Sequence, residues 1–301
     1  MIKAAIEMGT NSTRLLIADY KEGKINVLSR DLITTRLGEG VDSNKALTEA
    51  AMKRGIRALK AFKKEMDTYE IKATKLVGTS ALRDVNNSYE FQKLIKEELD
   101  FNLEVISGLR EAELIYQGVS ISYDFSNFII VDIGGGSTEF IWKNQDEDKV
   151  VMDSLNIGAV RITERFVENI EQPLGRNLVD EIASYVNKEV KKEIDILPGI
   201  DNIIGVGGTI TTLAAMLLKL DEHKPETIHD YTLRYSDVNK IMDRLRKLDL
   251  KRRKKVKGLN PDRADIIVAG IIILVEIMKV LRTLKLRVSN YDILHGLLVE
   301  A

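Results

Sequence analysis

The apolar and polar positions of the chain form a repeated pattern of strands that end in glycine turns. An apolar, largely β-branched run at 128–133 stops at three glycines, and a second apolar run begins at Phe140. Such runs predict buried strands. The same order of strand, turn and strand lies between Ile6 and Tyr20, around Gly-Thr-Asn. We therefore expect one strand-turn-strand element in each half of the chain.

Further strands alternate with segments that have apolar residues at helical spacing. We expect a strand pair within 24–40, and later strands that lead into turns at Gly78 and Gly207. Helices are expected at about 48–69, 88–99, 178–193, 269–281 and 292–301, with a pair of charged helices around 238–248. Alternating strands and helices indicate an α/β protein.

The two strand-turn-strand elements also match in sequence. The residues from Glu7 read EMGTNSTRLLI and those from Asp132 read DIGGGSTEFIW, so that the acid, a glycine, the serine and the threonine coincide. A chance match over so few positions is the alternative, and the shared strand context argues against it. The simplest explanation is two related lobes, each contributing a phosphate-binding hairpin to a shared cleft.

The second turn has residue types that suit phosphate and a hard metal ion. Its glycines are Gly134, Gly135 and Gly136. Because they lack Cβ, backbone N–H groups can approach phosphate oxygens closely. Ser137 adds a hydroxyl, and Asp132 and Glu139 flank the turn, as a Mg²⁺ ion with one or two carboxylate ligands would require. A plain hairpin is the alternative, although two-residue turns usually serve that purpose.

Composition excludes several classes of function. The 301 residues are enough for two domains, and a net charge of -1 provides no global basic field for nucleic acid. The absence of cysteine excludes disulfides and thiol nucleophiles, and the three histidines show no zinc spacing. No apolar run is long enough to span a bilayer, and the N-terminus shows no signal segment. We expect a cytoplasmic protein with neither a membrane nor a nucleic-acid partner.

Other candidate residues have two interpretations each. Arg83, just after a Gly-Thr-Ser turn, either meets an anion or is solvated near a helix start. Gly207, Gly208 and Thr209 form either an anion site at a helix N-terminus or a tight strand-to-helix turn. The basic run KRRKKVKG at 251–258 is either a solvated face or a guide for an anionic substrate.

Taken together, the motifs resemble those of one protein family. In chain order they are GTNSTRLLIAD, TSALRD, VISGLREAELIYQGV, VDIGGGSTEF, SLNIGAVRITERF, GVGGTITTLAA and LNPDRADIIVAG. The set is similar to that of the Ppx/GppA phosphatases, which are exopolyphosphatases and guanosine pentaphosphate phosphohydrolases of the actin, sugar-kinase and Hsp70 superfamily. The resemblance implies two ribonuclease-H-like α/β domains around a central cleft, at 1–122 and 123–301, with the last helix at about 291–301 packing back on the first. Among family members, the chain resembles the short, two-domain type.

The resemblance also implies roles for single residues. The family's catalytic glutamate falls on Glu111, otherwise an ordinary helix N-terminal acid, which becomes the general base for the attacking water. Asp132 and Glu139, with Glu7 at the matching place in the first repeat, are the expected Mg²⁺ ligands. Phosphate contacts are expected from Thr10, Asn11, Ser12, Arg14, Arg83, Gly134, Gly135, Gly136, Ser137, Gly207, Gly208 and Thr209.

Three positions depart from the family pattern. Glu7 stands where the family usually has Asp, which changes its reach to a metal or water by one methylene. Arg110 stands where a second acid often precedes the catalytic one, and it can pair with substrate or lower the basicity of Glu111. His295 stands where glutamate is more usual.

The expected function is that of a Mg²⁺-dependent exopolyphosphatase, which removes the terminal phosphate from linear inorganic polyphosphate. The alternative substrate is pppGpp, for whose guanine base the sequence offers no identified stacking or hydrogen-bonding residue. An ATP-dependent small-molecule kinase of the same superfamily and a non-catalytic sensor of polyphosphate or ppGpp are further alternatives. The oligomeric state, monomer or homodimer, stays open.

Overall fold

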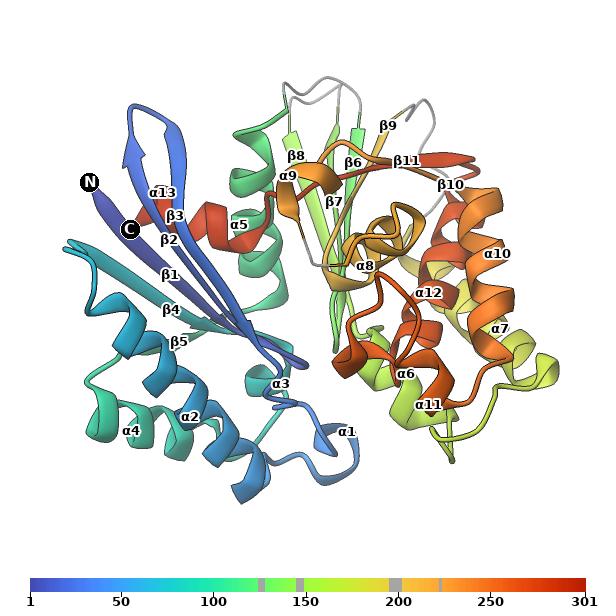
Figure 1. Cartoon of the computed structure of the whole chain (residues 1–301), viewed down its shortest axis with the longest axis horizontal. Helices are drawn as coiled ribbons and strands as arrows, with labels where there is room; N and C mark the ends of the chain where they lie inside the picture. The colour runs from blue at the N-terminus through green and yellow to red at the C-terminus, as the bar shows by residue number, and fades with distance from the viewer. Residues whose placement is uncertain (124–127, 145–148, 195–201, 222–223) are drawn as a thin grey trace. The chain divides into compact units, whose positions relative to one another are not determined.

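The computed structural model describes residues 1–123, 128–144, 149–194, 202–221 and 224–301. The chain divides into two compact units: unit 1 is Met1–Asp124 with Tyr291–Ala301, and unit 2 is Phe125–Asn290. Each unit has one sheet with helices packed against it (Figure 1). The expected α/β class with two related domains is therefore confirmed.

The sheet of unit 1 combines antiparallel and parallel neighbours. Its strands are β1 Ile2–Met8, β2 Thr13–Lys21, β3 Lys24–Ile33, β4 Ala73–Gly78 and β5 Leu103–Val105. They lie in the order β3-β2-β1-β4-β5, with β1, β2 and β3 antiparallel and with β4 and β5 parallel to β1. The expected strand pair at 24–40 is wrong, because only β3 joins the sheet. The N–H groups of Arg36 and Gly38 bond the β1–β2 turn instead.

Helices lie on both faces of this sheet (Figure 1). They are α1 Val41–Asn44, α2 Glu49–Met66, α3 Ser80–Arg83, α4 Ser88–Leu99, α5 Gly108–Ser120 and α13 Ile293–Glu300. Successive side chains of β1 point to opposite faces, so Ala4, Ile6 and Met8 enter the core formed with α2 and α4. Lys3 and Glu7 point to the other face, where α5 and α13 lie.

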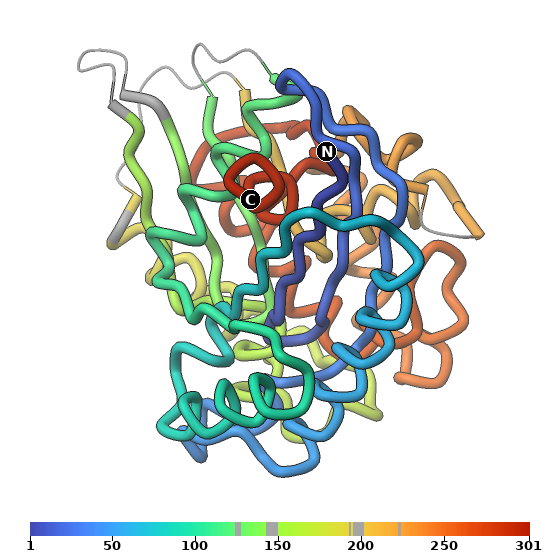
Figure 2. The backbone as a smooth tube through the Cα atoms, turned by 90° about the vertical axis from the view of Figure 1, so that its left-hand side faces the viewer, coloured from blue at the N-terminus to red at the C-terminus, as the bar shows by residue number. Residues whose placement is uncertain are grey.

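The last helix, α13, crosses α5 at very short range. A Cβ on Gly118 of α5 would lie 2.0 Å from the carbonyl oxygen of Asp292, and one on Gly296 would lie 2.0 Å from that of Leu114. Both positions therefore require glycine. Lys3 Nζ donates to the carbonyl oxygen of Leu298 at 3.0 Å, so the two ends of the chain lie near each other in unit 1 (Figure 2).

The sheet of unit 2 repeats the arrangement of unit 1. Its described strands are β6 Phe128–Ile133, β7 Thr138–Asn144, β8 Lys149–Leu155, β9 Asn202–Val206, β10 Thr232–Arg234 and β11 Lys285–Val288. Their order is β8-β7-β6-β9-β11-β10. As in unit 1, the first three are antiparallel and the next two run parallel to the central strand, here β6. The added strand β10 pairs antiparallel with β11.

Unit 2 has a large helical layer. Its helices are α6 Ala159–Phe166, α7 Arg176–Glu193, α8 Gly208–Leu217, α9 Pro225–Ile228, α10 Tyr235–Arg246, α11 Leu250–Arg253, the 3₁₀ turn η1 Pro261–Arg263, and α12 Ile267–Val280. The apolar α12 is buried along its length because it packs against α6, α7, α8 and α10. The expected helix pair around 238–248 is wrong. Val238, Ile241, Met242 and Leu245 continue one apolar face, so a single helix, α10, spans them.

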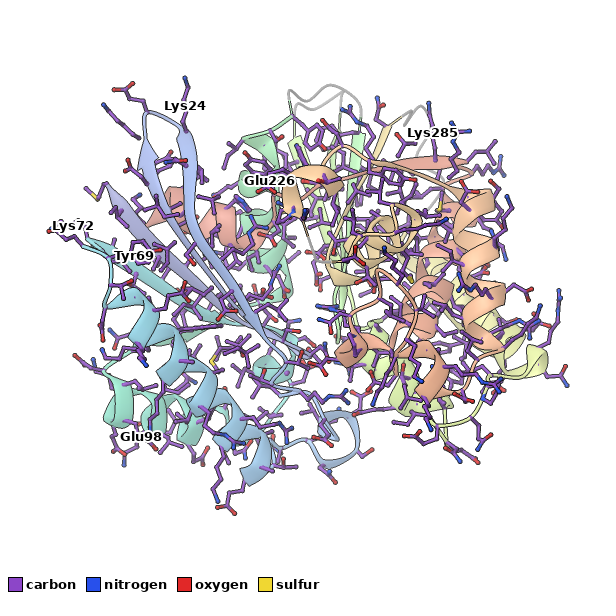
Figure 3. All side chains as sticks on the ribbon, in the orientation of Figure 1. Lys24, Tyr69, Lys72, Glu98, Glu226 and Lys285 are labelled. Carbon is purple, nitrogen blue, oxygen red and sulfur yellow. The ribbon has the colours of Figure 1, made fainter. Side chains whose placement is uncertain are left out.

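The surface of unit 1 is rich in charge. The labelled side chains of Lys24, Lys72 and Glu98 extend away from the sheet (Figure 3).

Within the described residues, no helix combines the length and apolar character that crossing a membrane would need.

Candidate active site

The two glycine turns have the same backbone geometry. The N–H of Gly9, between β1 and β2, donates to the carbonyl oxygen of Ser12 at 3.0 Å. The N–H of Gly134, between β6 and β7, donates to that of Ser137 at the same distance of 3.0 Å. A Cβ on Gly9 would lie 3.1 Å from the carbonyl oxygen of Ser12, and a Cβ on Gly134 would lie 3.1 Å from that of Ser137. The repeat predicted from the sequence is thus confirmed as a structural repeat.

The turn in unit 2 is held by the start of α6. Two N–H groups from the first turn of α6 donate to the carbonyl oxygens of Gly134 and Gly135 at 3.0 and 2.8 Å. Arg161 Nε donates to that of Gly136 at 2.7 Å. A Cβ on Gly158 would lie 2.3 Å from Gly135 O, so glycine is needed for this approach. Among the described residues, the N–H groups of Gly135 and Gly136 donate to no backbone acceptor.

The turn in unit 1 is held in a similar way by the segment after β3. Its residues Thr10, Asn11 and Ser12 are all buried. The N–H groups of Arg36 and Gly38 donate to the carbonyl oxygens of Asn11 and Thr10, each at 2.8 Å. Asn11 Nδ2 donates to Ser12 Oγ at 3.3 Å. In both units, therefore, the carbonyl side of the turn is occupied by protein.

The two repeats differ in the charges beside the turn. Glu7 pairs in register with Arg14, and Arg14 Nε donates to Glu7 Oε2 at 2.6 Å. The equivalent pair in unit 2 is Asp132 and Glu139, two acids directly opposite each other on one face of the sheet. Both are buried, and Ser154 Oγ donates to Glu139 Oε1 at 2.9 Å. Like charges at such positions repel, so this place favours a cation.

The turn between β9 and α8 lies beside Asp132. Gly207 has φ of 90°, and a Cβ there would lie 2.3 Å from Asp132 Oδ1. A Cβ on Gly208 would lie 2.0 Å from an NH atom of Arg263, so this guanidinium rests on the first residue of α8. Thr209 is buried next to it. The helix N-terminus and an arginine together favour an anion.

Arg263 is a candidate that the sequence-based site lacks. Its motif, LNPDRAD, contains the residue, but the motif does not show which side chain reaches α8. The contact joins η1 to a helix start more than 50 positions earlier in the sequence, which no local pattern reveals.

The predicted base, Glu111, lies in the first turn of α5. Ser107 caps this helix by accepting the N–H of Arg110, and Glu111 is 8% exposed. Arg83 donates to Glu111 Oε2 at 3.2 Å and to the carbonyl oxygen of Ile106 at 3.1 Å. The structure thus brings together two of the predicted residues, one acid and one arginine.

The predicted metal ligands lie in different units. Asp132 and Glu139 are neighbours in unit 2, whereas Glu7 belongs to unit 1 and contacts Arg14. Across the part of the chain that the structure describes, no three His, Asp or Glu side chains gather into a group that could hold a metal. Any metal in unit 2 would therefore need ligands from water or substrate.

The other departures have structural partners in unit 1. Arg110 pairs with Glu113 at 2.5 Å and also with Glu300, and the hydrogen bond that Arg110 donates to Glu113 raises the pKa of Arg110. The basic group next to Glu111 is therefore engaged by these two acids. His295 is buried and completes a capping box with Asp292 at the start of α13.

The basic run at 251–257 is only partly a surface feature. Arg253 is fully buried. Two other cations of the run form ion pairs, Arg252 with Asp249 and Lys257 with Asp221. The interpretation of the whole run as a solvated face or substrate guide is therefore wrong for Arg253. A buried guanidinium that bonds backbone carbonyl oxygens cannot meet a substrate.

Two related α/β units with equivalent glycine turns define the class as a two-domain α/β protein built from a repeat. The sequence model of the Ppx/GppA phosphatase family matches residues 16–301, and the chain belongs to this family. The resemblance stated from the motifs is confirmed. The expected class of enzyme, a hydrolase of phosphoric anhydrides, is confirmed with it.

Relatives of three kinds are similar over almost the whole chain. A bifunctional 3-dehydroquinate synthase/phosphatase of Fusobacterium nucleatum is 36% identical over 99% of this chain. Exopolyphosphatase 2 of Mycobacterium tuberculosis is 32% identical over 98%, and a guanosine-5'-triphosphate,3'-diphosphate pyrophosphatase of Vibrio parahaemolyticus is 30% identical over 99%. The chain spans 46% of the Fusobacterium protein and 58% of the Vibrio protein, but 96% of the Mycobacterium protein.

Solved structures agree with this assignment. The Ppx/GppA family member of Aquifex aeolicus has a TM-score of 0.83 and 32% identity, and the match covers 100% of this chain and 97% of that one. The similarity thus extends over both units.

Proposed function

We propose that the chain is an exopolyphosphatase that hydrolyses the terminal phosphate of linear polyphosphate with water activated by a general base. The observation that carries the proposal is the environment of Glu111. It is a buried carboxylate in the first turn of α5, it is held by Arg83, and it matches the family's catalytic glutamate.

Each group has a definite task in this reaction. Glu111 accepts a proton from the attacking water, an effect typically worth about a hundredfold to ten-thousandfold in rate. Arg83 holds Glu111 by one oxygen and places a permanent positive charge beside it. The turn N–H groups of Gly135 and Gly136 and the guanidinium of Arg263 offer hydrogen bonds to phosphate oxygens. Phosphoryl transfer depends mainly on such positioning and charge neutralisation.

Mg²⁺ fits the acids of unit 2 better than those of unit 1. Asp132 and Glu139 stand opposite each other, so their Cβ atoms lie about 5 Å apart and supply two hard oxygen ligands. Substrate phosphates and water would complete the shell, and the bound ion would neutralise phosphate charge. Glu7 suits a metal less, because Arg14 already holds its Oε2 atom. We therefore propose Asp132 and Glu139, without Glu7, as the Mg²⁺ ligands.

Polyphosphate is the preferred substrate in this proposal, and pppGpp is the alternative. The candidate groups are generic anion ligands, namely turn N–H groups and arginines, and a repeating polyanion needs nothing more. The cytoplasmic location and the oligomeric state stay predictions.

The test is phosphate release by the purified protein with Mg²⁺, from long-chain polyphosphate and from pppGpp side by side. Glu111→Gln should lose nearly all activity. The matched control is Glu113→Gln, a change of the same kind two residues along α5, which should keep it. Faster release from pppGpp would reverse the substrate preference. ATP-dependent phosphorylation of a small acceptor would establish a kinase, and binding without turnover would establish a sensor.

A further inference from the structure

Arg14 is held from two sides by carboxylates. Its Nε donates to Glu7 Oε2 at 2.6 Å, and NH2 contacts the same oxygen. Its NH1 donates to Asp292 Oδ2 at 2.5 Å. Asp292 lies 278 residues later in the chain, at the start of α13, and all three residues belong to unit 1. Every nitrogen of this guanidinium therefore contacts an acid.

Asp292 is fixed in the ionised form. It is 6% exposed, and its Oδ1 accepts the N–H of Leu294 at 3.0 Å as the N-cap of α13. Burial alone would raise the pKa of its carboxyl, but Arg14 and His295 together hold that pKa far below its usual range. Arginine is always protonated at working pH. The pair of Asp292 and Arg14 is therefore a full ion pair.

His295 adds no charge to this group. Burial lowers its pKa, and so do the nearby guanidinium groups of Arg30 and Arg14, although Asp292 opposes the effect. Its Nδ1 lies 3.1 Å from Asp292 Oδ1, and its Nε2 lies 3.3 Å from an NH atom of Arg30. A neutral ring with its proton on Nδ1 donates to Asp292 Oδ1 and accepts from Arg30 at Nε2. The other neutral tautomer instead lets Nδ1 accept the backbone N–H of Asp292 at 3.2 Å, as in the capping box, and neither tautomer carries a charge.

Glu7, Arg14 and Asp292 consequently carry a net charge of about one negative unit at neutral pH. An arginine in this state attracts phosphate weakly, although its position at the start of β2 matches a phosphate-binding position of the family. The equivalent position in unit 2 is the acid Glu139, so the other repeat contains no such arrangement.

We propose that Asp292 is a positioning residue that sets the strength of anion binding. It holds Arg14 on Glu7 and so reduces the positive charge that the turn of unit 1 offers to a phosphate chain. The inference rests on the proposed function only for the identity of the anion. Its consequence is that the last helix of the chain lowers the affinity of this enzyme for polyphosphate.

The test is a double-mutant cycle in binding, with tripolyphosphate as the probe and calorimetry as the readout. Four proteins are compared, each carrying Glu111→Gln so that no turnover occurs: the parent, Asp292→Asn, Arg14→Met, and the double variant. Asparagine caps a helix as well as aspartate does, so the first change removes charge and keeps the start of α13. Unfolding curves confirm that each protein is folded.

Asp292→Asn should tighten tripolyphosphate binding about three- to tenfold, the effect expected when the released Arg14 guanidinium acts on the anion as one additional positive charge over roughly 8 Å in a partly solvated site. The gain should disappear in the Arg14→Met background, because Asp292 acts through Arg14. Unchanged or weaker binding by Asp292→Asn, or an equal gain without Arg14, overturns the inference. Failure of the active enzyme to release phosphate, with these affinities as expected, overturns only the proposed function. Absence of binding by all four proteins overturns both.

Discussion

Replacing Arg253 by methionine should destabilise unit 2 far more than replacing its neighbour Arg252. Arg253 is fully buried, although it lies within a run of cations that looks like a surface. Its guanidinium donates to the carbonyl oxygens of Leu248 at 3.2 Å and Ala264 at 3.0 Å. It also donates to those of Ile170 at 2.9 Å and Gln172 at 3.1 Å.

These four bonds join three segments of unit 2. Ile170 and Gln172 lie in the loop before α7, and Leu248 lies in the turn before α11. Ala264 comes directly after η1. Without the guanidinium, four carbonyl oxygens lose a donor, at a cost of about 1 kcal/mol or more each. Part of this free-energy cost is offset, because methionine is neutral and its burial avoids the penalty of burying a charge. The same burial lowers the pKa of Arg253 in the wild type. A net loss of about 3 kcal/mol follows.

The assay is denaturant and thermal unfolding of the wild type, Arg253→Met and Arg252→Met. A loss of about 3 kcal/mol corresponds to a fall in Tm of about 6–12 °C for a unit of this size. Arg252 is exposed and pairs only with Asp249 among the contacts described for it, so its variant should change stability by less than about 0.5 kcal/mol. Equal small effects of the two substitutions would contradict this structural role of Arg253.

Three further predictions concern the charged groups. Millimolar Mg²⁺ at about five times its Kd should raise the Tm of unit 2 by about 2–4 °C, and Glu139→Gln should abolish this shift while exposed Glu226→Gln keeps it. Charge reversal of exposed Lys254 and Lys255 should raise the KM for long polyphosphate severalfold at low salt, with no change at about 0.5 M salt or with tripolyphosphate. Because the folded-state pKa of Asp292 is lowered, its stabilisation is present above about pH 4 and lost as the pH falls, so Asp292→Asn should weaken the decline in stability under acid. An unchanged loss of stability at low pH in Asp292→Asn would count against the pairing of Asp292 with Arg14.

Local patterns predicted the strands and turns well. The repeat of Glu7 to Ser12 and Asp132 to Ser137 was visible because the turn needs glycine and the strands need apolar residues at fixed spacing. The helix at 88–99 was also predicted with its observed limits. These features depend on neighbours in sequence, which a single chain displays directly.

Partners distant in sequence could not be predicted. The pairing of Arg14 with Asp292 and the contact of Arg263 with Gly208 depend on how the sheets and helices pack. Burial of Arg253 was missed for the same reason, because a run of cations indicates charge but not which side chain points inward. The exclusion of Glu7 from the proposed metal site likewise follows from its hydrogen bond with Arg14. The extra methylene of Glu7, which the sequence does show, is not the reason.

The role of Glu111 as general base is tested by single-turnover phosphate release by Glu111→Gln, with the affinity for polyphosphate measured in parallel. If Glu111 is the general base, the rate should fall about a hundredfold to ten-thousandfold while the Kd changes little. Glu113→Gln should match the wild type in both quantities. A Glu111→Gln protein that retains the wild-type rate would contradict the assignment, and with it the proposed mechanism.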